Sequence, residues 1–372
     1  MSVLKKILQY FKHEAVLTVA LIAALASFLL VPPGAHTLAG IDTTTLLMLF
    51  SLMTIVAGFR HMGAFDKLAG AVTSRIHTLR GLSMVLIAAN FLLAMVATND
   101  VALITLVPFT LLLMQSAKIQ HLTLTVVLET IAANLGSMVT PIGNPQNLYL
   151  YSSGRMSAIE FPLHTAFYAV LAFDLLMLCC LLIPKLAVQP ANAPQEKLPA
   201  RKLWLYAVLA VIALLALCEI IPAWALAVVV AVAVFAADKP VLKQVDYTLL
   251  ATFVCFFVFV ASVKAYAPVS AWLEGLMAGS PLVTSLLVSQ VISNVPACLL
   301  LSPFTKSTSA LMLGVNIGGL GTIVASLASL ISFRLYGTAE NAKKGLFMGV
   351  FTLWNGLFLA AMLLLAWLMG AI

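Results

Sequence analysis

The sequence carries the same short polar motif twice, in two apolar segments that lie 195 positions apart. Residues 98–110 read Thr-Asn-Asp-Val-Ala-Leu-Ile-Thr-Leu-Val-Pro-Phe-Thr, and residues 293–305 read Ser-Asn-Val-Pro-Ala-Cys-Leu-Leu-Leu-Ser-Pro-Phe-Thr. A second pair follows downstream, with Asn-Leu-Gly-Ser-Met-Val-Thr at 134–140 and Asn-Ile-Gly-Gly-Leu-Gly-Thr at 316–322. Two polar, helix-breaking interruptions at corresponding places in each half are typical of a secondary transporter with internal symmetry.

Composition places the chain in the membrane. Hydrophobic residues make up 63% of it and charged residues only 9%, whereas about a quarter of the residues are charged in a soluble domain. The sequence therefore predicts an all-α polytopic membrane protein. Its first apolar stretch, residues 15–31, is followed by many others, so we interpret it as a membrane span and not as a cleaved signal peptide. We expect the mature chain to begin near Met1.

Several classes of function are excluded. The sequence holds no Gly-x-x-x-x-Gly-Lys-Ser/Thr phosphate loop, and no predicted loop exceeds about 20 residues, which excludes ATP-driven transport by this chain alone and a sizeable soluble enzyme domain. The net charge of +7 does not indicate nucleic-acid binding, because the basic residues lie between spans and form no run. The cysteines show no metal-ligand spacing and are expected to be apolar fillers. They are Cys179, Cys180, Cys218, Cys255 and Cys298.

Apolar segment lengths predict nine membrane crossings, of which two are broken near their centres, and two re-entrant hairpins. The broken segments are 121–153 and 308–333, and the hairpins are 82–116 and 281–305. The other spans are 15–31, 43–59, 161–184, 202–218, 223–237, 247–266 and 346–369.

With the N-terminus in the cytoplasm, this crossing scheme satisfies the positive-inside rule. It places 17 of the 20 Lys and Arg residues inside and only Arg155, Lys264 and Lys306 outside. If the number of crossings between any two loops were wrong by one, this unequal distribution of Lys and Arg between the two sides would be lost. The inside residues are Lys5, Lys6, Lys12, Arg60, Lys67, Arg75, Arg80, Lys118, Lys185, Lys197, Arg201, Lys202, Lys239, Lys243, Arg334, Lys343 and Lys344.

The parity of the crossings predicts two repeats of inverted topology. Repeat one, residues 1–187, returns to the cytoplasm and is followed by the Pro-containing linker 188–201. The extra span within 202–222 lets repeat two, residues 223–372, begin from the outside. The polar centres of the two repeats are then expected to face each other near the membrane midplane.

Each repeat also has an amphipathic segment between its second span and its hairpin. Residues 62–79 alternate apolar and basic faces at helical spacing, which predicts an interfacial helix, and residues 269–277 are its counterpart on the opposite face. These segments are either membrane anchors or arms that link a moving core to a fixed scaffold. Asp42 and Asp246 come just before a span in each half and are predicted to be helix N-caps.

The arms of the two hairpins are short for membrane spans. Residues 82–97 and 101–116 are about 16 residues each, against about 20 for a full crossing, and could form a hairpin or two tilted spans. In the second copy the arms are only about 11 or 12 residues, with Pro296 just past the tip. A hairpin is the better interpretation there, and symmetry extends it to the first copy.

The broken segments unwind at 137–147 and 319–329, where glycines and prolines cluster. Irregular backbone at membrane depth survives only where it lines a cavity or holds a ligand. Carbonyls that end the first half-helices could coordinate a small cation, and amides that begin the second half-helices could bind an anion. The candidate cation ligands are Asn99, Ser137, Thr140, Gly143, Asn294, Gly319, Thr322 and Ser326. The candidate solute contacts are Thr98, Asn99, Asp100, Asn144, Asn147, Ser293, Asn294, Thr322 and Ser329.

The paired hairpin tips, the loop Thr-Pro-Ile-Gly-Asn-Pro-Gln-Asn at 140–147 and its partner at 319–329 resemble the ion transporter superfamily. That group includes divalent anion/sodium symporters, citrate and arsenite permeases, and sodium/proton antiporters of similar fold. The resemblance implies a homodimeric, elevator-type carrier in the inner (plasma) membrane of a bacterial cell, without a cofactor. It also implies that the solute lies between the two tips with a sodium ion beside each.

The tips depart from the symporter pattern, which has Ser-Asn-Thr at both. This chain has Thr98-Asn99-Asp100 at the first tip, closer to the arsenite permeases, and Ser293-Asn294-Val295 at the second. Relative to the symporter pattern, the first tip gains an acid and the second loses a hydroxyl.

Three acids fall inside predicted membrane segments, where an ionised carboxylate costs about 2.5 to 3.5 kcal/mol. Asp100 either caps a helix, or binds the coupling ion or takes up a proton, and these roles are compatible. Glu129 is the second candidate for proton coupling. Asp174 is expected to be paired or packed against the other half.

These patterns predict a secondary transporter for a small, anionic or oxyacid solute, coupled to sodium or protons. The alternatives are a sodium/proton antiporter without organic substrate and an arsenite-type efflux permease. A membrane-embedded enzyme lacks a catalytic constellation, because the histidines flank spans and do not meet the polar centres. Closed hairpins around paired sites favour alternating access over an open channel.

Overall fold

The computed structural model describes residues 14–73, 76–187 and 198–372, and these residues form helices joined by loops, with one isolated β-bridge between Thr78 and Ala187. Several sequence predictions lie outside the described residues, namely those for Lys5, Lys6, Lys12, Arg75, Lys197 and most of the linker 188–201.

The helices follow the predicted apolar segments closely. In the first half they are α2 (Ala15–Ser27), α3 (Ala35–Ala39), α4 (Thr43–His61), α5 (Ala64–Thr73), α6 (Leu79–Ala97), α7 (Asn99–Leu113), α8 (Ile119–Ser137), α9 (Pro145–Ser152), α10 (Glu160–Cys179) and η1 (Cys180–Leu182). In the second half they are α11 (Ala200–Leu217), α12 (Ala223–Asp238), η2 (Lys239–Gln244), α13 (Tyr247–Ala265), α14 (Ala267–Gly279), α15 (Pro281–Ile292), α16 (Asn294–Leu301), η3 (Ser302–Phe304), α17 (Thr308–Ile317), α18 (Leu327–Tyr336) and α19 (Lys344–Leu368).

Seven helices in the described part of the chain are long and apolar enough to cross a membrane. One of them is α6, with 19 residues, so the prediction of a 16-residue hairpin arm was too short. The helix starts earlier because the Thr78 side chain caps it by accepting a hydrogen bond from the Gly81 N–H. The seven are α4, α6, α10 with η1, α11, α12 with η2, α13 and α19.

Local chemistry sets other helix ends. Asp42 accepts from Thr45 N at 3.0 Å and Asp246 accepts from Leu249 N at 2.9 Å, so both predicted N-caps are confirmed. The first span is shorter than predicted: α2 ends at Ser27, and two prolines follow at 32 and 33. The short helix α3 was not predicted from the sequence.

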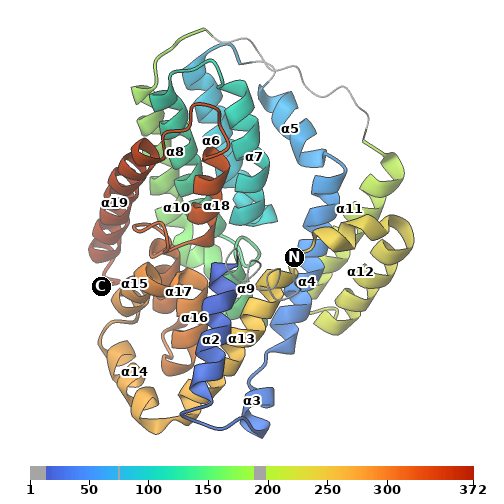
Figure 1. Cartoon of the computed structure of the whole chain (residues 1–372), viewed down its shortest axis with the longest axis vertical. Helices are drawn as coiled ribbons and strands as arrows, with labels where there is room; N and C mark the ends of the chain where they lie inside the picture. Colours follow the sequence, from blue (N-terminus) through green and yellow to red (C-terminus); the bar gives the residue numbers. More distant parts are fainter. Residues whose placement is uncertain (1–13, 74–75, 188–197) are drawn as a thin grey trace, which may run out of the picture.

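The two hairpin regions occupy opposite ends of the molecule. In Figure 1, α6, α7 and α8 fill the upper part, and α15, α16 and α17 fill the lower part. The long axis of the molecule therefore carries one hairpin region at each end.

Glycines allow the helices within each region to approach closely. A Cβ at Gly136 on α8 would lie 2.3 Å from the Phe91 carbonyl oxygen on α6, and one at Gly314 on α17 would lie 2.3 Å from the Leu282 oxygen on α15. Small residues at such contacts are the usual basis of helix association in membranes, where water does not drive burial.

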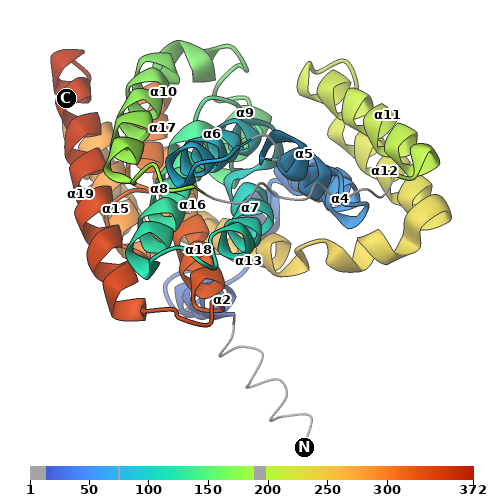
Figure 2. The same ribbon diagram turned by 90° about the horizontal axis from the view of Figure 1, so that it is seen from above.

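A separate group of helices, α4, α5, α11 and α12, lies to one side of the hairpin regions (Figure 2). Its contacts include the Tyr206 ring of α11, which lies so close to Gly58 of α4 that a Cβ there would be 1.9 Å away. Lys202 pairs with Asp238 at 2.8 Å, and Tyr206 Oη donates to the same carboxylate at 3.1 Å. We call these four helices the side group.

Candidate functional site

The two predicted hairpin tips share an unusual backbone conformation. Thr98 has φ 71° and ψ 150°, and Ser293 has φ 75° and ψ 154°. This region of backbone space is almost exclusive to glycine and costs about 1 to 3 kcal/mol per residue for other types. Because this backbone strain occurs at the same position of both tips, the structure around each tip must hold it in place.

Each tip is bonded to the unwound loop of the neighbouring broken helix. Asn99 N donates to the Gly143 oxygen at 3.0 Å, and Asn294 N donates to the Ala325 oxygen at 2.9 Å. Because Asn99 and Asn294 lie 195 positions apart and the two loop residues lie 182 apart, the pairing is the same in both halves. The tip and the loop therefore form one unit in each half.

The threonines of the two loops repeat the pattern. The Thr140 hydroxyl donates to the Met95 oxygen, and the Thr322 hydroxyl donates to the Gln290 oxygen at 3.0 Å. Met95 and Gln290 again lie 195 positions apart. Both threonines thus hold the first arm of their hairpin, and Thr322 is exposed at this position instead of reaching the centre.

A buried set of side chains, which we call the amide cluster, joins the halves. Its residues are Asn134, Asn144, Asn147, Asn316, Ser326 and Ser329.

Within the amide cluster, the bonds cross from one half to the other. Asn316 accepts from Asn144 Nδ2 at 2.9 Å and donates to Asn147 Oδ1 at 2.8 Å. Asn134 Oδ1 accepts from the Ser326 hydroxyl at 2.9 Å across the halves and, within the first half, from Asn99 Nδ2 outside the cluster at 3.3 Å. Equivalent positions play equivalent parts, so each broken helix is held by the loop of the other half.

The amide cluster contains several of the candidate solute contacts. Asn144, Asn147 and Ser329 are buried, and their polar atoms form hydrogen bonds within the protein. Sequence reasoning did not select Asn134 or Asn316 as site residues. The signal was present, because each begins the second duplicated motif.

The remaining predicted residues lie near the tips. Ser293 and Asn294 are buried, and the Ser293 hydroxyl reaches the Ala325 oxygen at 3.4 Å. Ser137 donates to the Asn134 oxygen at 2.9 Å. The Gly319 oxygen accepts from Asn134 Nδ2 at 3.5 Å.

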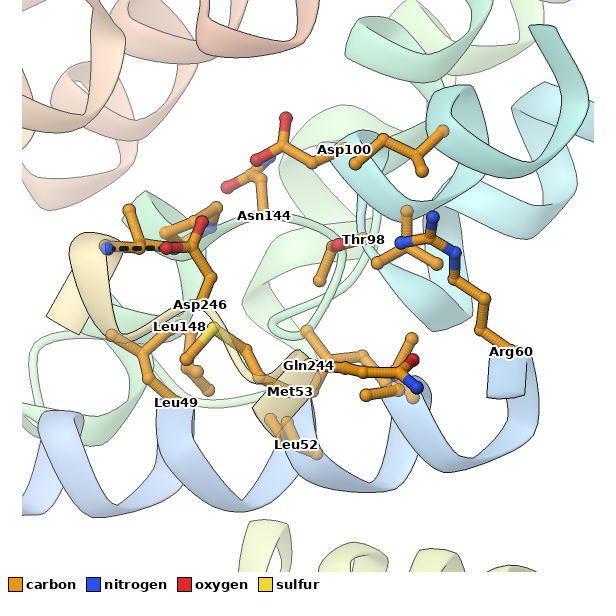
Figure 3. Close-up of a pocket in the computed structure, with 17 residues that line it drawn as sticks. Leu49, Leu52, Met53, Arg60, Thr98, Asp100, Asn144, Leu148, Gln244 and Asp246 are labelled. Atoms are coloured by element: carbon orange, nitrogen blue, oxygen red, sulfur yellow. Dashed lines mark hydrogen bonds between the residues drawn. The ribbon is translucent and has the colours of Figure 1, made fainter. Parts of the chain in front are cut away.

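A cavity of about 350 Å³ lies between α4 of the side group and the first hairpin tip (Figure 3). Thr98, Asp100 and Asn144, which are three of the candidate solute contacts, line it from the tip and the loop. Its lining contains none of the predicted contacts from the second half. The further polar residues are Arg60 on α4, Gln244 at the end of η2 and Asp246 before α13, and leucines and a methionine of α4 supply an apolar wall.

Asp100 is the most exceptional polar group of this cavity. It lies in the first turn of α7, and its Oδ1 atom is buried without a hydrogen-bond partner among the described residues. Figure 3 shows Asp100, Asp246 and Arg60 entering the cavity from three different elements. A carboxylate without a partner here is expensive, although the α7 N-terminus favours negative charge.

Glu129 lies apart from the cavity, within α8. Its Oε1 accepts from the Thr110 hydroxyl at 2.6 Å and from Asn90 Nδ2 at 3.0 Å. Its Oε2 and the Asn90 Oδ1 are buried without a partner in the described part of the chain. Asn134 follows five residues later, about 7.5 Å along the helix axis.

Two further expectations concern acids and metals. Asp174 was predicted to be paired or packed, but α10 turns it outward and it is exposed, so that prediction was wrong. The described residues contain no group of three His, Cys, Asp or Glu side chains that could hold a metal ion. Oxygen ligands from the loops are the groups present for a cation such as sodium.

Comparison with known proteins gives the family. The sequence model of the citrate transporter family, CitMHS, matches residues 11–312. The inner membrane protein YbiR of Escherichia coli strain K12 is 34% identical over 304 residues, which cover 80% of this chain and 81% of YbiR. An uncharacterized transporter of Methanocaldococcus jannaschii is 29% identical over 316 residues, covering 83% of this chain and 84% of the relative.

A solved structure supports the same fold. The YdaH transporter of Alcanivorax borkumensis matches with a TM-score of 0.59 at 14% sequence identity, over 90% of this chain and 87% of that chain. The resemblance to the ion transporter superfamily inferred from the hairpin tips is thereby confirmed. The chain belongs to the citrate transporter family and is a membrane transporter, not an enzyme.

Proposed function

We propose that this protein is a secondary active transporter for a small anionic or oxyacid solute, coupled to sodium or to protons. The observation that carries the proposal is the pair of strained tips, Thr98 and Ser293, each bonded to the unwound loop of a broken helix. Interrupted helices in corresponding places of two halves are the usual site of solute and ion binding in secondary transporters.

The two halves are inverted repeats in this proposal. The spacing of 195 positions between the hairpins and 182 between the loops supports an equivalence of α6–α9 with α15–α18. The positions of the two hairpin regions at opposite ends of the long axis agree with an inverted arrangement (Figure 1). In this proposal the N-terminus is cytoplasmic, which the distribution of Lys and Arg supports.

Transport then proceeds by an elevator motion. The side group of α4, α5, α11 and α12 is the fixed scaffold, through which two copies form a homodimer. The hairpins, broken helices and amide cluster form the moving body. The cavity beside Thr98 supports this division, because one wall comes from α4 and the other from the first tip.

The solute binds in this cavity. The guanidinium of Arg60 can pair with an acid group of the solute in a bidentate manner. The N-terminus of α9, which begins at Pro145 beside Asn144, adds favourable dipoles for an anion. The apolar wall from α4 suits the carbon or neutral part of a small solute.

Asp100 binds the coupling ion. Asp100 and Asp246 both line the cavity in which the solute is proposed to bind. A cation or proton on the Asp100 carboxylate neutralises one of these two negative charges, which would otherwise repel an anionic solute. Binding of the two is therefore mutually favourable, which is the requirement for coupled transport.

Thermal stability of the purified protein tests the proposal, because a ligand that binds the folded state raises the melting temperature. Dicarboxylates, citrate, arsenite, sulfate and phosphate are each added in sodium and in choline buffers at several pH values. We expect one anion or oxyacid to stabilise the protein, and Arg60→Gln to abolish the effect. The control Arg201→Gln, at the exposed start of α11, should retain it. If every solute leaves the melting temperature unchanged, the proposed solute class is wrong.

A sodium/proton antiporter without organic solute is the second candidate, because Asp100 and Asp246 both line the cavity. It predicts stabilisation by sodium or by pH alone, with no effect of any anion. An arsenite-type efflux permease is a special case of the first proposal and predicts that arsenite is the stabilising solute.

A further inference from the structure

The loops of the two broken helices contain backbone carbonyls that could coordinate a cation. The last carbonyls of a helix have no partner within that helix, so those at the ends of α8 and α17 need one from elsewhere. At membrane depth an unpaired carbonyl costs several kcal/mol. The hydrogen bonds of these carbonyls therefore indicate whether the loops have been left open for an ion.

In the second half, the side chain of Gln290 enters the loop after α17. Its Nε2 donates to the Gly318 oxygen at 2.7 Å and to the Leu320 oxygen at 3.0 Å. Its Oε1 accepts from Thr322 N at 2.9 Å. Gly321 has φ +98°, and a Cβ there would lie 2.3 Å from Gln290 Oε1, so the loop encloses the amide tightly.

In the first half, a different residue supplies the same group. Asn147 Nδ2 donates to the Met138 oxygen at 3.1 Å and to the Thr140 oxygen at 3.0 Å. Met138 and Leu320 are equivalent positions, 182 residues apart. In each loop, two backbone carbonyls thus accept from one side-chain NH₂ group. In the first half this group is on Asn147 of α9, and in the second half it is on Gln290 of the hairpin arm α15.

The two amide donors, Gln290 and Asn147, do not occupy corresponding positions of the duplicated sequence. The counterpart of Gln290 in the first half is Met95, which has no amide, and the counterpart of Asn147 in the second half is Ser329. Two unrelated positions therefore provide the same donor to the same carbonyl. This convergence indicates that the loops require a donor at this point.

An NH₂ group and a small cation satisfy carbonyl oxygens in the same way, by placing positive charge between them. At 2.7 to 3.1 Å from two carbonyl oxygens, each amide nitrogen lies where a cation shared by those oxygens would have to lie. An ion could enter only if the amide left, and the amide would then be buried without its partners.

Within the proposed function, on which this inference rests, we infer that the side-chain amides of Gln290 and Asn147 are built-in substitutes for a cation in the two loops, so that neither loop binds sodium. The coupling ion then binds at Asp100 alone. Gln290 is then a residue that excludes sodium from its loop.

The test compares melting temperatures of the full-length protein in equal concentrations of sodium chloride and choline chloride. All variants carry Asp100→Asn, which removes the carboxylate proposed to bind the coupling ion, and we expect this parent variant to melt at the same temperature in both salts. Gln290→Met, which copies Met95 into the second half, frees the Gly318 and Leu320 carbonyls and should gain a sodium-specific rise of about 2 °C or more. The same substitution at Gln115, an exposed loop residue, should gain none.

A second variant covers the case in which Gln290→Met does not fold. Gln290→Glu keeps the shape of the side chain but replaces the NH₂ donor with an oxygen, so that carboxylate and carbonyls face one another and need a cation. We expect a larger sodium-specific rise for this variant.

The inference is overturned if sodium stabilises the Asp100→Asn parent variant relative to choline. It is also overturned if the folded Gln290 variants remain insensitive to sodium. The solute panel, run on the wild type in sodium and in choline, tests the proposed function separately. A solute that stabilises the wild type leaves the transporter proposal intact whatever the Gln290 variants show, whereas a panel without effect refutes the solute proposal alone.

Discussion

Replacement of Asn316 by alanine tests whether the amide cluster holds the two halves together. Asn316 is buried in α17 and makes three bonds across the halves, accepting from Asn144 Nδ2 at 2.9 Å and from Gln146 Nε2 at 3.5 Å and donating to Asn147 Oδ1 at 2.8 Å. The variant leaves the Asn147 oxygen without any other described partner, while Asn144 keeps its bond to Ser137 at 3.0 Å.

The magnitude follows from these bonds. Each group left buried and unpaired costs about 1 to 3 kcal/mol, and hydrogen bonds between membrane helices contribute about 0.6 to 1.7 kcal/mol. Alanine regains roughly 0.7 kcal/mol of helix propensity. We therefore expect Asn316→Ala to lower the free energy of unfolding by about 2 to 4 kcal/mol.

The matched control is Asn355→Ala in α19. Asn355 is also fully buried, but it donates only to the Phe351 oxygen of its own helix, and its Oδ1 has no partner among the described residues. Its replacement should cost less than about 1 kcal/mol.

Denaturant unfolding of both variants in the same detergent, followed by tryptophan fluorescence, measures the two free energies. Equal losses for Asn316→Ala and Asn355→Ala would refute the argument, because they would show that bonds between the halves contribute no more than a bond within one helix.

Three further predictions concern packing, coupling and topology. Gly136→Ala should lower the free energy of unfolding by about 1 to 3 kcal/mol, because its Cβ would lie 2.3 Å from the Phe91 oxygen. Gly356→Ala in α19, where a Cβ meets nothing within 4 Å, should raise it by about 0.5 to 1 kcal/mol in the same unfolding assay. Asp100→Asn should bind the stabilising solute with no dependence on pH or sodium, because the amide cannot exchange a cation or proton; thermal shifts that keep the wild-type ion dependence would contradict this. A single cysteine in place of Lys306, in a chain without its native cysteines, should react with an impermeant maleimide added outside the cell; labelling from the cytoplasm alone would overturn the crossing scheme.

The helices were largely predictable because their causes are local. Apolar length, glycine and proline breaks and acidic N-caps identified the broken segments and the caps at Asp42 and Asp246. The prediction erred where short-range signals are weak. The five-residue α3 has no apolar length to reveal it, and the early start of α6 depends on the single hydroxyl of Thr78.

The candidate site was predicted only in part. The duplicated motif located both tips and both loops, and Thr98, Asp100 and Asn144 do line a cavity. The contribution of Arg60 could not be foreseen, because Arg60 reaches the cavity from α4, a helix that contains neither of the duplicated motifs. Gln290 was missed for a different reason, since an amide in an apolar arm was visible but the loop carbonyls that it contacts were not.

The sequence alone therefore determined that this is a helical membrane protein with two halves, and where each half is interrupted, because hydropathy, helix breakers and duplication are properties of the chain. Only the tertiary structure decided which polar groups satisfy one another. The bond between Asn134 and Ser326, for example, joins residues 192 positions apart. In a membrane the partner of a buried amide is set by which helices pack together, and such proximity is created by folding and is not encoded in local spacing.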